Sequence, residues 1–208
     1  FVSINTNLIK LIRTSGIKKK PINFFVLEKS AVGEDYKKKI SKIVSHMKKN
    51  KIDFHFITSS ENVAWLLNIR GHDSNFSPLP NSHLLIDRKQ KIYLFCDLRK
   101  ISSKLKSKKR GVKFIDIKHV DKFLNLISKK KFIIDQISCS IYFTNLIRKN
   151  NKIVAKNDPI YLLKSTKSKT EIINTKKVHE KDGAALTKFI FLMKNNYKKG
   201  KISEISAQ

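Results

Sequence analysis

The chain has 208 residues, of which 45 are Lys or Arg and 16 are Asp or Glu, so its formal net charge is +29. A hydrophobic content of 40% with 9% aromatic residues excludes a disordered chain and fits a globular protein with a real core. No apolar run is long enough to span a membrane, and Cys96 and Cys139 are too few for a disulfide framework.

The large positive charge suggests a nucleic-acid partner, but the type of basic residue argues against one. Only six of the basic residues are Arg, the side chain best suited to bidentate contacts with phosphates and bases. Lys, Ile and Asn are abundant throughout, as in proteins from AT-rich genomes, which accounts for Lys on every polar face. We therefore expect neither a nucleic-acid partner nor a membrane partner.

Most of the chain alternates between strand patterns and helix patterns, which predicts an α/β layer architecture. We expect strands or extended pieces at residues 23–27, 54–58, 83–87, 91–97, 112–115, 131–134 and 152–155. We expect helices at residues 35–50, 61–67, 98–109, 121–128 and 141–149, with Ser60 capping the second and Gly111 ending the third. Residues 83–97 form a predicted β-hairpin.

The pattern changes after Asp158-Pro159, where strand signals cease. One long helix is predicted at residues 169–195, and its small residues around Gly183 indicate tight packing against another element. The apolar face of this helix is predicted to contain Ile172, Ile173, Val178, Ala185, Leu186, Phe189, Ile190 and Met193. A domain boundary is therefore expected at residues 158–168.

Both ends of the chain indicate a fragment of a longer protein. Phe1 is not preceded by Met, and the first residues lack the features of a signal peptide. Ser203-Glu204 resembles the start of a capped helix that Gln208 cuts short.

The segment Ser59–Asp87 carries the most specialised chemistry of the chain. It contains Trp65, which is the only Trp, and a charged corner with Arg70, His72 and Asp73. Charged residues on a loop of a rigid scaffold are frequently functional, but anchoring of the loop by salt bridges is the simpler interpretation of this trio. These four residues are the candidate substrate-binding residues.

The rest of the chain lacks a recognisable catalytic or metal-binding pattern. The six His residues are dispersed and show no HExxH spacing, and Cys96 is expected to be a buried thiol. No GxSxG, P-loop or GxGxxG sequence occurs. We therefore expect no catalytic residue and no metal ligand within this chain.

Three stretches resemble the Xaa-Pro aminopeptidases (aminopeptidase P) of the creatinase/prolidase group of pita-bread metallopeptidases. They lie in the same order as in that family and cover nearly the whole chain. The matching segments are Asn62 to Asp73 (NVAWLLNIRGHD) with Pro78 and Ser82 to Asp87, then Asp158 to Ile160 and Leu163 to Lys167, and finally Glu171, Val178 to Leu186 (VHEKDGAAL), Phe189 and Ile202 to Ala207.

This resemblance implies a fold and a division into domains. The fold is a three-layer α/β domain of the creatinase N-terminal type with a mixed sheet, followed by the first helices of a truncated α+β pita-bread domain. Residues 1–28 would lead in from a preceding domain, residues 29–160 would form the creatinase/prolidase N-terminal-like domain, and residues 161–208 would begin the metallopeptidase domain.

The resemblance also implies a function for the parent protein. The family releases the N-terminal residue from Xaa-Pro peptides with a dinuclear centre, usually of two Mn²⁺ ions, whose ligands lie beyond the segments matched here. A cytoplasmic homodimer is expected, with Trp65, Arg70, His72 and Asp73 at the mouth of the active site. This fragment alone would bind no metal and would be inactive. The alternatives are a non-catalytic pita-bread binding or dimerisation module, and a prolidase, which is an Xaa-Pro dipeptidase.

Overall fold

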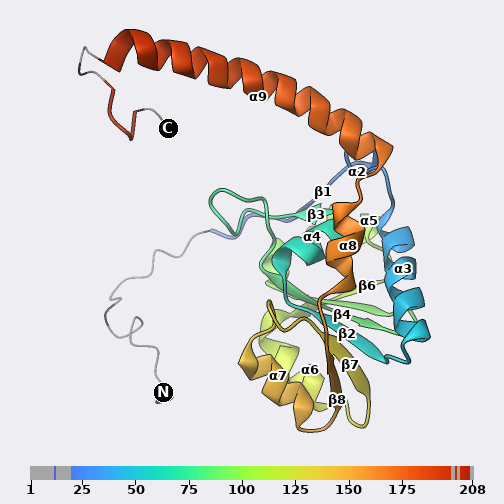
Figure 1. Cartoon of the computed structure of the whole chain (residues 1–208). Helices are drawn as coiled ribbons and strands as arrows, with labels where there is room; N and C mark the ends of the chain where they lie inside the picture. The colour runs from blue at the N-terminus through green and yellow to red at the C-terminus, as the bar shows by residue number, and fades with distance from the viewer. Residues whose placement is uncertain (1–11, 13–19, 198–199, 201, 207–208) are drawn as a thin grey trace.

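A six-stranded mixed sheet forms the centre of the structure, a computed structural model that describes residues 12, 20–197, 200 and 202–206 (Figure 1). The strand order is β6-β5-β4-β2-β7-β8, and only β4 runs antiparallel to its neighbours. These strands are β2 (Phe54–Ile57), β4 (Ser82–Asp87), β5 (Ile92–Cys96), β6 (Val112–Asp116), β7 (Lys131–Ile134) and β8 (Lys152–Ala155). A separate pair joins β1 (Phe25–Val26) to β3 (Ile69–Arg70).

Helices cover both faces of this sheet. The α-helices are α2 (Lys29–Val32), α3 (Tyr36–Lys49), α4 (Ser60–Leu67), α5 (Ser103–Lys108), α6 (Val120–Asn125), α7 (Ile141–Arg148), α8 (Pro159–Ser165) and α9 (Lys169–Asn196). Two 3₁₀ turns, η1 (Leu98–Lys100) and η2 (Ile117–His119), follow β5 and β6. The predicted α/β fold with a mixed sheet between two helical layers is confirmed.

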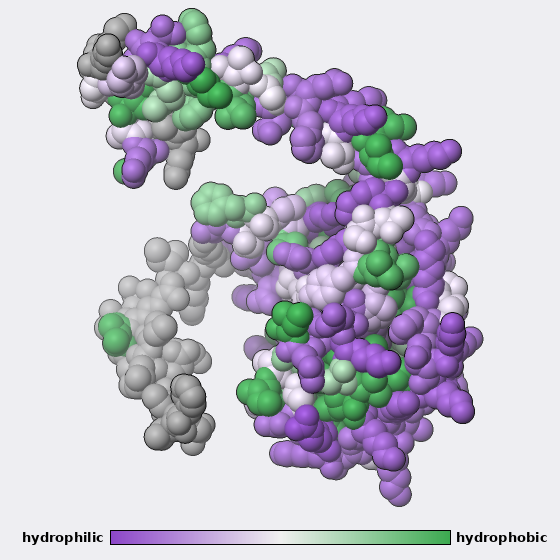
Figure 2. Space-filling model, in the orientation of Figure 1, coloured by the Kyte–Doolittle hydropathy of each residue, from purple (hydrophilic) through white to green (hydrophobic). Residues whose placement is uncertain are grey.

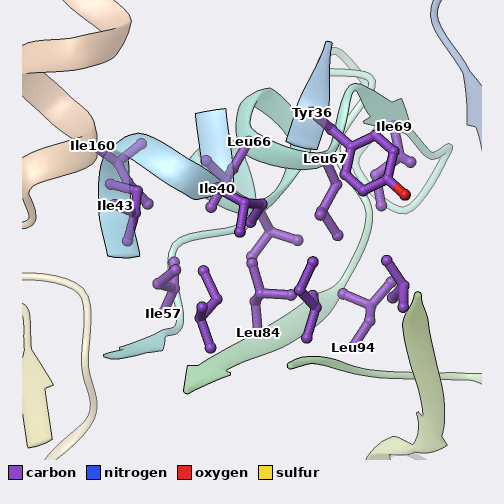
Figure 3. Close-up of a cluster of buried hydrophobic side chains, with 14 of the residues drawn as sticks. Tyr36, Ile40, Ile43, Ile57, Leu66, Leu67, Ile69, Leu84, Leu94 and Ile160 are labelled. Atoms are coloured by element: carbon purple, nitrogen blue, oxygen red, sulfur yellow. The ribbon is translucent and has the colours of Figure 1, made fainter. Parts of the chain in front are cut away.

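The two helical layers produce two separate hydrophobic cores. Because successive side chains on a strand point to opposite faces, Ile57 of β2 joins one core and Phe56 joins the other. The first core packs α3, α4 and α8 against the sheet, and Figure 3 shows its side chains converging from these helices on Leu84 and Leu94. The second core lies under α6 and α7.

Helix α3 shows how the sequence builds the first core. Asp35 caps it by accepting a hydrogen bond from the backbone N–H of Lys37 at 2.8 Å. Apolar residues at helical spacing, among them Ile40, Ile43 and Met47, are buried against the sheet. The predicted helix at residues 35–50 is therefore confirmed. The Lys-rich face is not wholly solvated, however, because Lys39 is buried.

Several predicted details are wrong. The cap of α4 is Ser59 and not Ser60, because the hydroxyl of Ser59 accepts the N–H of Asn62. The predicted helix at residues 98–109 is broken into η1 and α5, because the hydroxyl of Ser102 caps a new helix and Ile101 is extended. Around Ser203, where a helix was expected to begin, the described residues form a single turn.

Four short elements had no sequence prediction, namely α2, β3, η2 and α8. Residues 158–168 were predicted as a boundary, but Asp158 caps α8 and Pro159 occupies its first turn. Residues 1–11 and 13–19 of the predicted lead-in lie outside the described residues, as do residues 198–199, 201 and 207–208.

Helix α9 extends away from the sheet (Figure 1). A capping box starts it: Ser168 Oγ accepts from Glu171 N at 3.2 Å, and Glu171 Oε2 accepts from Ser168 N at 2.7 Å. Its N-terminal part rests on α2, where Asn174 Nδ2 donates to the carbonyl of Ser30 at 2.8 Å. None of its residues is buried, so the predicted apolar face is exposed in this chain (Figure 2).

Within the part of the chain that the structure describes, no helix has the length and apolar character needed to cross a bilayer.

Candidate functional site

The predicted site begins where α4 turns sharply into β3. Helix α4 ends at Asn68, whose φ of 52° and ψ of 42° place it in the left-handed region. Its side chain stabilises this bend, because Nδ2 donates to the carbonyl of Glu34 at 2.8 Å. The next two residues form β3, in which Arg70 pairs with Phe25 and Ile69 with Val26. The N-terminal strand thus holds the start of the charged corner in place.

The loop of residues 71–80, called here the 71–80 loop, closes on itself at Gly71. The N–H of Gly71 donates to the carbonyl of Pro78 at 3.2 Å. A Cβ at this position would lie 2.9 Å from Pro80 Cα and 3.0 Å from both Leu79 O and a ring carbon of Phe24. Only glycine fits this close approach, which explains the Arg-Gly pair in the sequence.

Asp73 anchors the same loop. Its Oδ2 accepts the N–H of Asn81 at 2.7 Å, and its Oδ1 forms an ion pair with Lys100. Its own N–H donates to the carbonyl of Leu79 at 3.3 Å. The loop therefore has a fixed base, and it displays Phe76, which is 96% exposed. The expectation that Asp73 anchors the loop is met, although its cation is Lys100 and not Arg70.

Arg70 and His72 have different environments. Nη1 of Arg70 donates to the carbonyls of Ala64 at 3.1 Å and Ile69 at 2.9 Å, so the guanidinium covers the C-terminal end of α4. Burial lowers the pKa of Arg70 from its usual value. His72 is exposed, and its ring lies 5.4 Å from the ring of Phe25. His72 is therefore the member of the trio that is most open to a ligand.

Trp65 lies on a different side of the corner. With residues of α2, α3, α8 and the first turn of α9, it lines a hollow of about 730 Å³, which we call the Trp65 hollow. Arg70, His72 and Asp73 do not line it. Within the described residues, no hydrogen bond or ion pair joins any two of the four candidates. The structure thus divides the predicted site into the Trp65 hollow and the 71–80 loop.

Lys39 is a residue of this corner that the sequence did not reveal. Its Nζ donates to the Trp65 carbonyl at 2.9 Å and to Asn68 Oδ1 at 2.7 Å, and it lies 4.0 Å from the centre of the Trp65 ring. Burial lowers the pKa of Lys39 to about 8, although Glu171 and Glu34 partly oppose the shift. Lys39 is one of three consecutive lysines, so no sequence signal distinguished it.

A second buried polar cluster, called here the Asp158 network, ties the linker helix α8 to the sheet. Asp158 accepts from Asn62 Nδ2 at 2.8 Å and from the N–H of Ile160 at 2.9 Å. His55 Nε2 lies 3.4 Å from its Oδ1, and Lys164 Nζ donates to Asn62 Oδ1 at 3.0 Å. Burial lowers the pKa of His55, which favours the neutral ring. The network joins β2, α4 and α8.

The described residues include no group of three or more His, Cys, Asp or Glu side chains that could hold a metal ion. Both cysteines are free and buried, as expected for Cys96. Burial raises the pKa of the Cys96 thiol to about 12 and also raises that of Cys139, so neither forms a reactive thiolate near neutral pH. The geometry suits binding and positioning, and no catalytic group is assigned to these residues.

The family model "Creatinase/Prolidase N-terminal domain" matches residues 18–171. Among curated proteins, Xaa-Pro aminopeptidase 1 of Dictyostelium discoideum is 33% identical over 196 residues, which cover 90% of this chain and 31% of the relative. Human Xaa-Pro aminopeptidase 2 is 26% identical over 219 residues, which cover 99% of this chain and 32% of the relative. The chain thus spans about a third of the length of these relatives.

The fold also matches a solved structure. The crystal structure of X-prolyl aminopeptidase from Caenorhabditis elegans, described as a cytosolic enzyme with a di-nuclear active site, superposes with a TM-score of 0.87. The match covers 99% of this chain and 35% of that one at 24% identity. An Xaa-Pro dipeptidase from Bacillus anthracis matches less closely, with a TM-score of 0.59 over 76% of this chain. At these identities the structural likeness is evidence of the fold.

Proposed function

The chain belongs to the creatinase/prolidase N-terminal domain family, and on that basis we propose that it is part of a metal-dependent Xaa-Pro aminopeptidase. The whole enzyme would release the N-terminal residue from peptides whose second residue is proline. One observation carries the proposal: the Dictyostelium Xaa-Pro aminopeptidase is similar along 90% of this chain, which is more than the residues 18–171 that the N-terminal domain family covers. A shared sheet domain alone would not distinguish this enzyme from other family members.

The proposed division of the enzyme into domains rests on the resemblance of its segments to the family. Residues 29–160 would form the N-terminal-like domain, residues 1–28 would connect it to a preceding domain, and residues 161–208 would begin the catalytic domain. Two divalent metal ions, proposed to be Mn²⁺, would supply the activation of water for hydrolysis of the peptide bond. The described residues do not fit such a centre, so its ligands would lie elsewhere in the enzyme and this fragment alone would be inactive.

Trp65, Arg70, His72 and Asp73 are proposed to form part of the wall around the mouth of the active site. The support is the construction of the 71–80 loop, which has a fixed base at Gly71 and Asp73 and an exposed His72. In the view of Figure 1, the loop projects from the sheet domain toward the space beneath α9. Trp65 would contribute from the neighbouring hollow at the start of α9.

The enzyme is further proposed to act in the cytoplasm as a homodimer. The C. elegans structure to which this fold is similar is described as that of a cytosolic enzyme. Light scattering on the purified enzyme measures its mass, and a monomer at micromolar concentration would contradict the dimer.

The activity is tested on the longer protein that contains this chain. We expect release of the first residue from Xaa-Pro-Xaa peptides, loss of activity after chelation with EDTA, and recovery with Mn²⁺. Hydrolysis of Xaa-Pro dipeptides alone would make the protein a prolidase. Absence of peptidase activity with any divalent metal would contradict the proposal and favour a non-catalytic binding or dimerisation module.

The mouth is tested in the same enzyme by comparing two histidine variants. His72→Ala should raise KM for the peptide about 5-fold, as expected for a lost contact of about 1 kcal/mol. His46→Ala is the matched control, because His46 is exposed on α3, away from the 71–80 loop. If His72→Ala and Arg70→Ala both leave KM and dimerisation unchanged, these residues do not line the mouth.

A further inference from the structure

A basic hollow lies at one end of the sheet, beside the N-terminal ends of strands β2, β7 and β8. It has a volume of about 530 Å³, and we call it the β7–β8 hollow. Its lining consists of Asp53 and residues from two turns, namely Lys129, Lys130, Lys131, Arg148, Lys149, Asn150, Asn151 and Lys152. Six of these nine side chains are cationic and one is anionic.

Backbone pairing brings the cations of the two turns together. Strands β7 and β8 are parallel, and Lys131 stands beside Lys152 in their register. The turns are joined by hydrogen bonds from Lys129 N to Asn150 O at 2.8 Å and from Lys130 N to Asn151 Oδ1 at 3.1 Å. The lining of the hollow thus comes from two segments that lie about 20 residues apart in the sequence and side by side in the fold.

The positive charge of the hollow is not neutralised by its single carboxylate. Asp53 Oδ2 already accepts the N–H of Lys131 at 2.9 Å, and Asp53 Oδ1 lies 3.6 Å from Arg88. Within the described residues, none of the six cations of the hollow forms an ion pair. Like charges beside one another on a ladder destabilise a sheet. A bound anion would relieve this repulsion.

The high Lys content of the chain does not explain this arrangement. At the opposite end of the sheet, β5, β6 and β7 are followed or ended by Asp97, Asp116 and Asp135. Two of the cations there form ion pairs, Arg99 with Asp97 and Lys100 with Asp73. The two ends of the sheet therefore differ in charge pairing, because carboxylates neutralise cations at the end with Asp97, whereas no described residue forms an ion pair with a cation of the hollow. Figure 2 shows the hydrophilic surface below β7 and β8.

The surroundings of the hollow indicate which anion it suits. Its volume is in the range of small-ligand sites. No aromatic side chain lines it, so it offers no stacking surface of the kind on which single-stranded nucleic acids depend. Arg148 can form a two-pronged contact with a phosphate, and the lysines can act as point charges around it.

We propose that the β7–β8 hollow binds a run of two or three phosphate groups, such as a free oligophosphate or the phosphate tail of a nucleotide. The hollow is separate from the proposed peptide site. Strand β4 begins beside the 71–80 loop and ends at the end of the sheet that carries the hollow. Its six residues span about 20 Å, which separates the two sites. The proposal does not depend on peptidase activity.

The test measures binding of tripolyphosphate to the full chain at constant ionic strength, by calorimetry and by the shift in Tm. We expect saturable binding with one site. Lys130→Glu/Lys149→Glu should weaken it at least about 10-fold, because two charge-assisted contacts become repulsive. Lys104→Glu/Lys106→Glu is the matched control, since these exposed lysines lie on α5, outside the hollow, and it should change the affinity less than about 2-fold.

Two further ligands distinguish the sources of the phosphates. ATP that binds more tightly than tripolyphosphate would assign the hollow to the phosphate tail of a nucleotide, and tripolyphosphate that binds more tightly than ATP would assign it to a free oligophosphate. A 20-base-pair duplex that binds while tripolyphosphate does not would mean that the edge recognises a nucleic-acid backbone, which overturns the small-ligand site. Equal weakening in the two charge-reversal variants, or no saturable binding of tripolyphosphate, would also overturn it.

Discussion

The sheet domain and helix α9 carry similar apolar side chains but bury them to opposite extents. Phe56 of β2 is 1% exposed within the second core, whereas Phe191 of α9 is 71% exposed. Helix α9 nevertheless has a complete capping box at its start. The contrast shows that local signals are enough to define a long helix, while burial of its side chains needs elements from elsewhere in the fold.

The largest expected difference between the two regions comes from removing one phenyl ring in each. Phe56→Ala should lower the free energy of unfolding by about 3–5 kcal/mol, because it opens a cavity beside Phe143 and His83. Phe191→Ala should change it by less than about 0.5 kcal/mol. Urea unfolding of the chain measures both. A large loss with Phe191→Ala would mean that α9 packs against the sheet domain in solution.

The next effect concerns the connection between the regions. Asp158→Ala should cost about 3 kcal/mol, because it removes the acceptor of Asn62 and the N-cap of α8 and leaves His55 without its carboxylate. Asp182→Ala, on exposed α9, is the control and should be nearly neutral. Thermal unfolding monitored by circular dichroism compares them. Similar Tm values for the two variants would show that the Asp158 network does not stabilise the fold.

A pair of glycine substitutions should have effects of opposite sign. Gly71→Ala should destabilise the chain by about 1–3 kcal/mol, because the new Cβ would collide with the backbone of Pro80 and Leu79. Gly183→Ala should stabilise α9 by up to about 1 kcal/mol, since a Cβ there meets nothing within 4 Å among the described residues. Stability and helical ellipticity measure the two effects. Destabilisation by Gly183→Ala would reveal a close packing partner at this point of α9.

The smallest effect is a dependence of stability on pH. Burial lowers the pKa values of His55 and His83 in the folded chain, so below about pH 6.5 the unfolded chain binds protons first. The free energy of unfolding is therefore unaffected by these histidines above that pH and decreases as the pH falls. The decrease is less than about 1 kcal/mol for each histidine at pH 6. Urea unfolding at pH 7.5 and 6.0 measures the loss. His55→Gln should reduce it and His179→Gln, on α9, should not. An equal pH dependence in all three proteins would exclude His55 as its source.

The regular elements were largely predictable from the sequence because their signals are local. The spacing of Ile40, Ile43 and Met47 predicted α3, and two short apolar runs separated by three polar residues predicted the hairpin of β4 and β5. The elements that were missed depend on distant partners. Strand β3 has two residues and exists because β1 pairs with it. Its conformation is not encoded in its own short sequence.

The candidate site was only partly predictable for the same reason. The resemblance pointed to Trp65, Arg70, His72 and Asp73 as one group, but their environments differ. Trp65 lines a hollow, Arg70 covers the end of α4, Asp73 anchors the 71–80 loop and His72 is exposed. Lys39 was not predicted, because only its burial in the fold distinguishes it from the two lysines before it. A side chain's neighbours depend on long-range contacts, which spacing along the chain does not report.

The sequence by itself determined the fold class, the family, the positions of most helices and strands, and the length of α9. Caps, apolar periodicity and family motifs are properties of neighbouring residues, so they can be read without coordinates. Only the tertiary structure decided that α9 leaves its apolar face uncovered, that Asp158 ties the linker to His55 and Asn62, and that lysines from two turns surround one hollow. These features arise when packing brings distant segments together, and the free energy of each depends on both partners being in place.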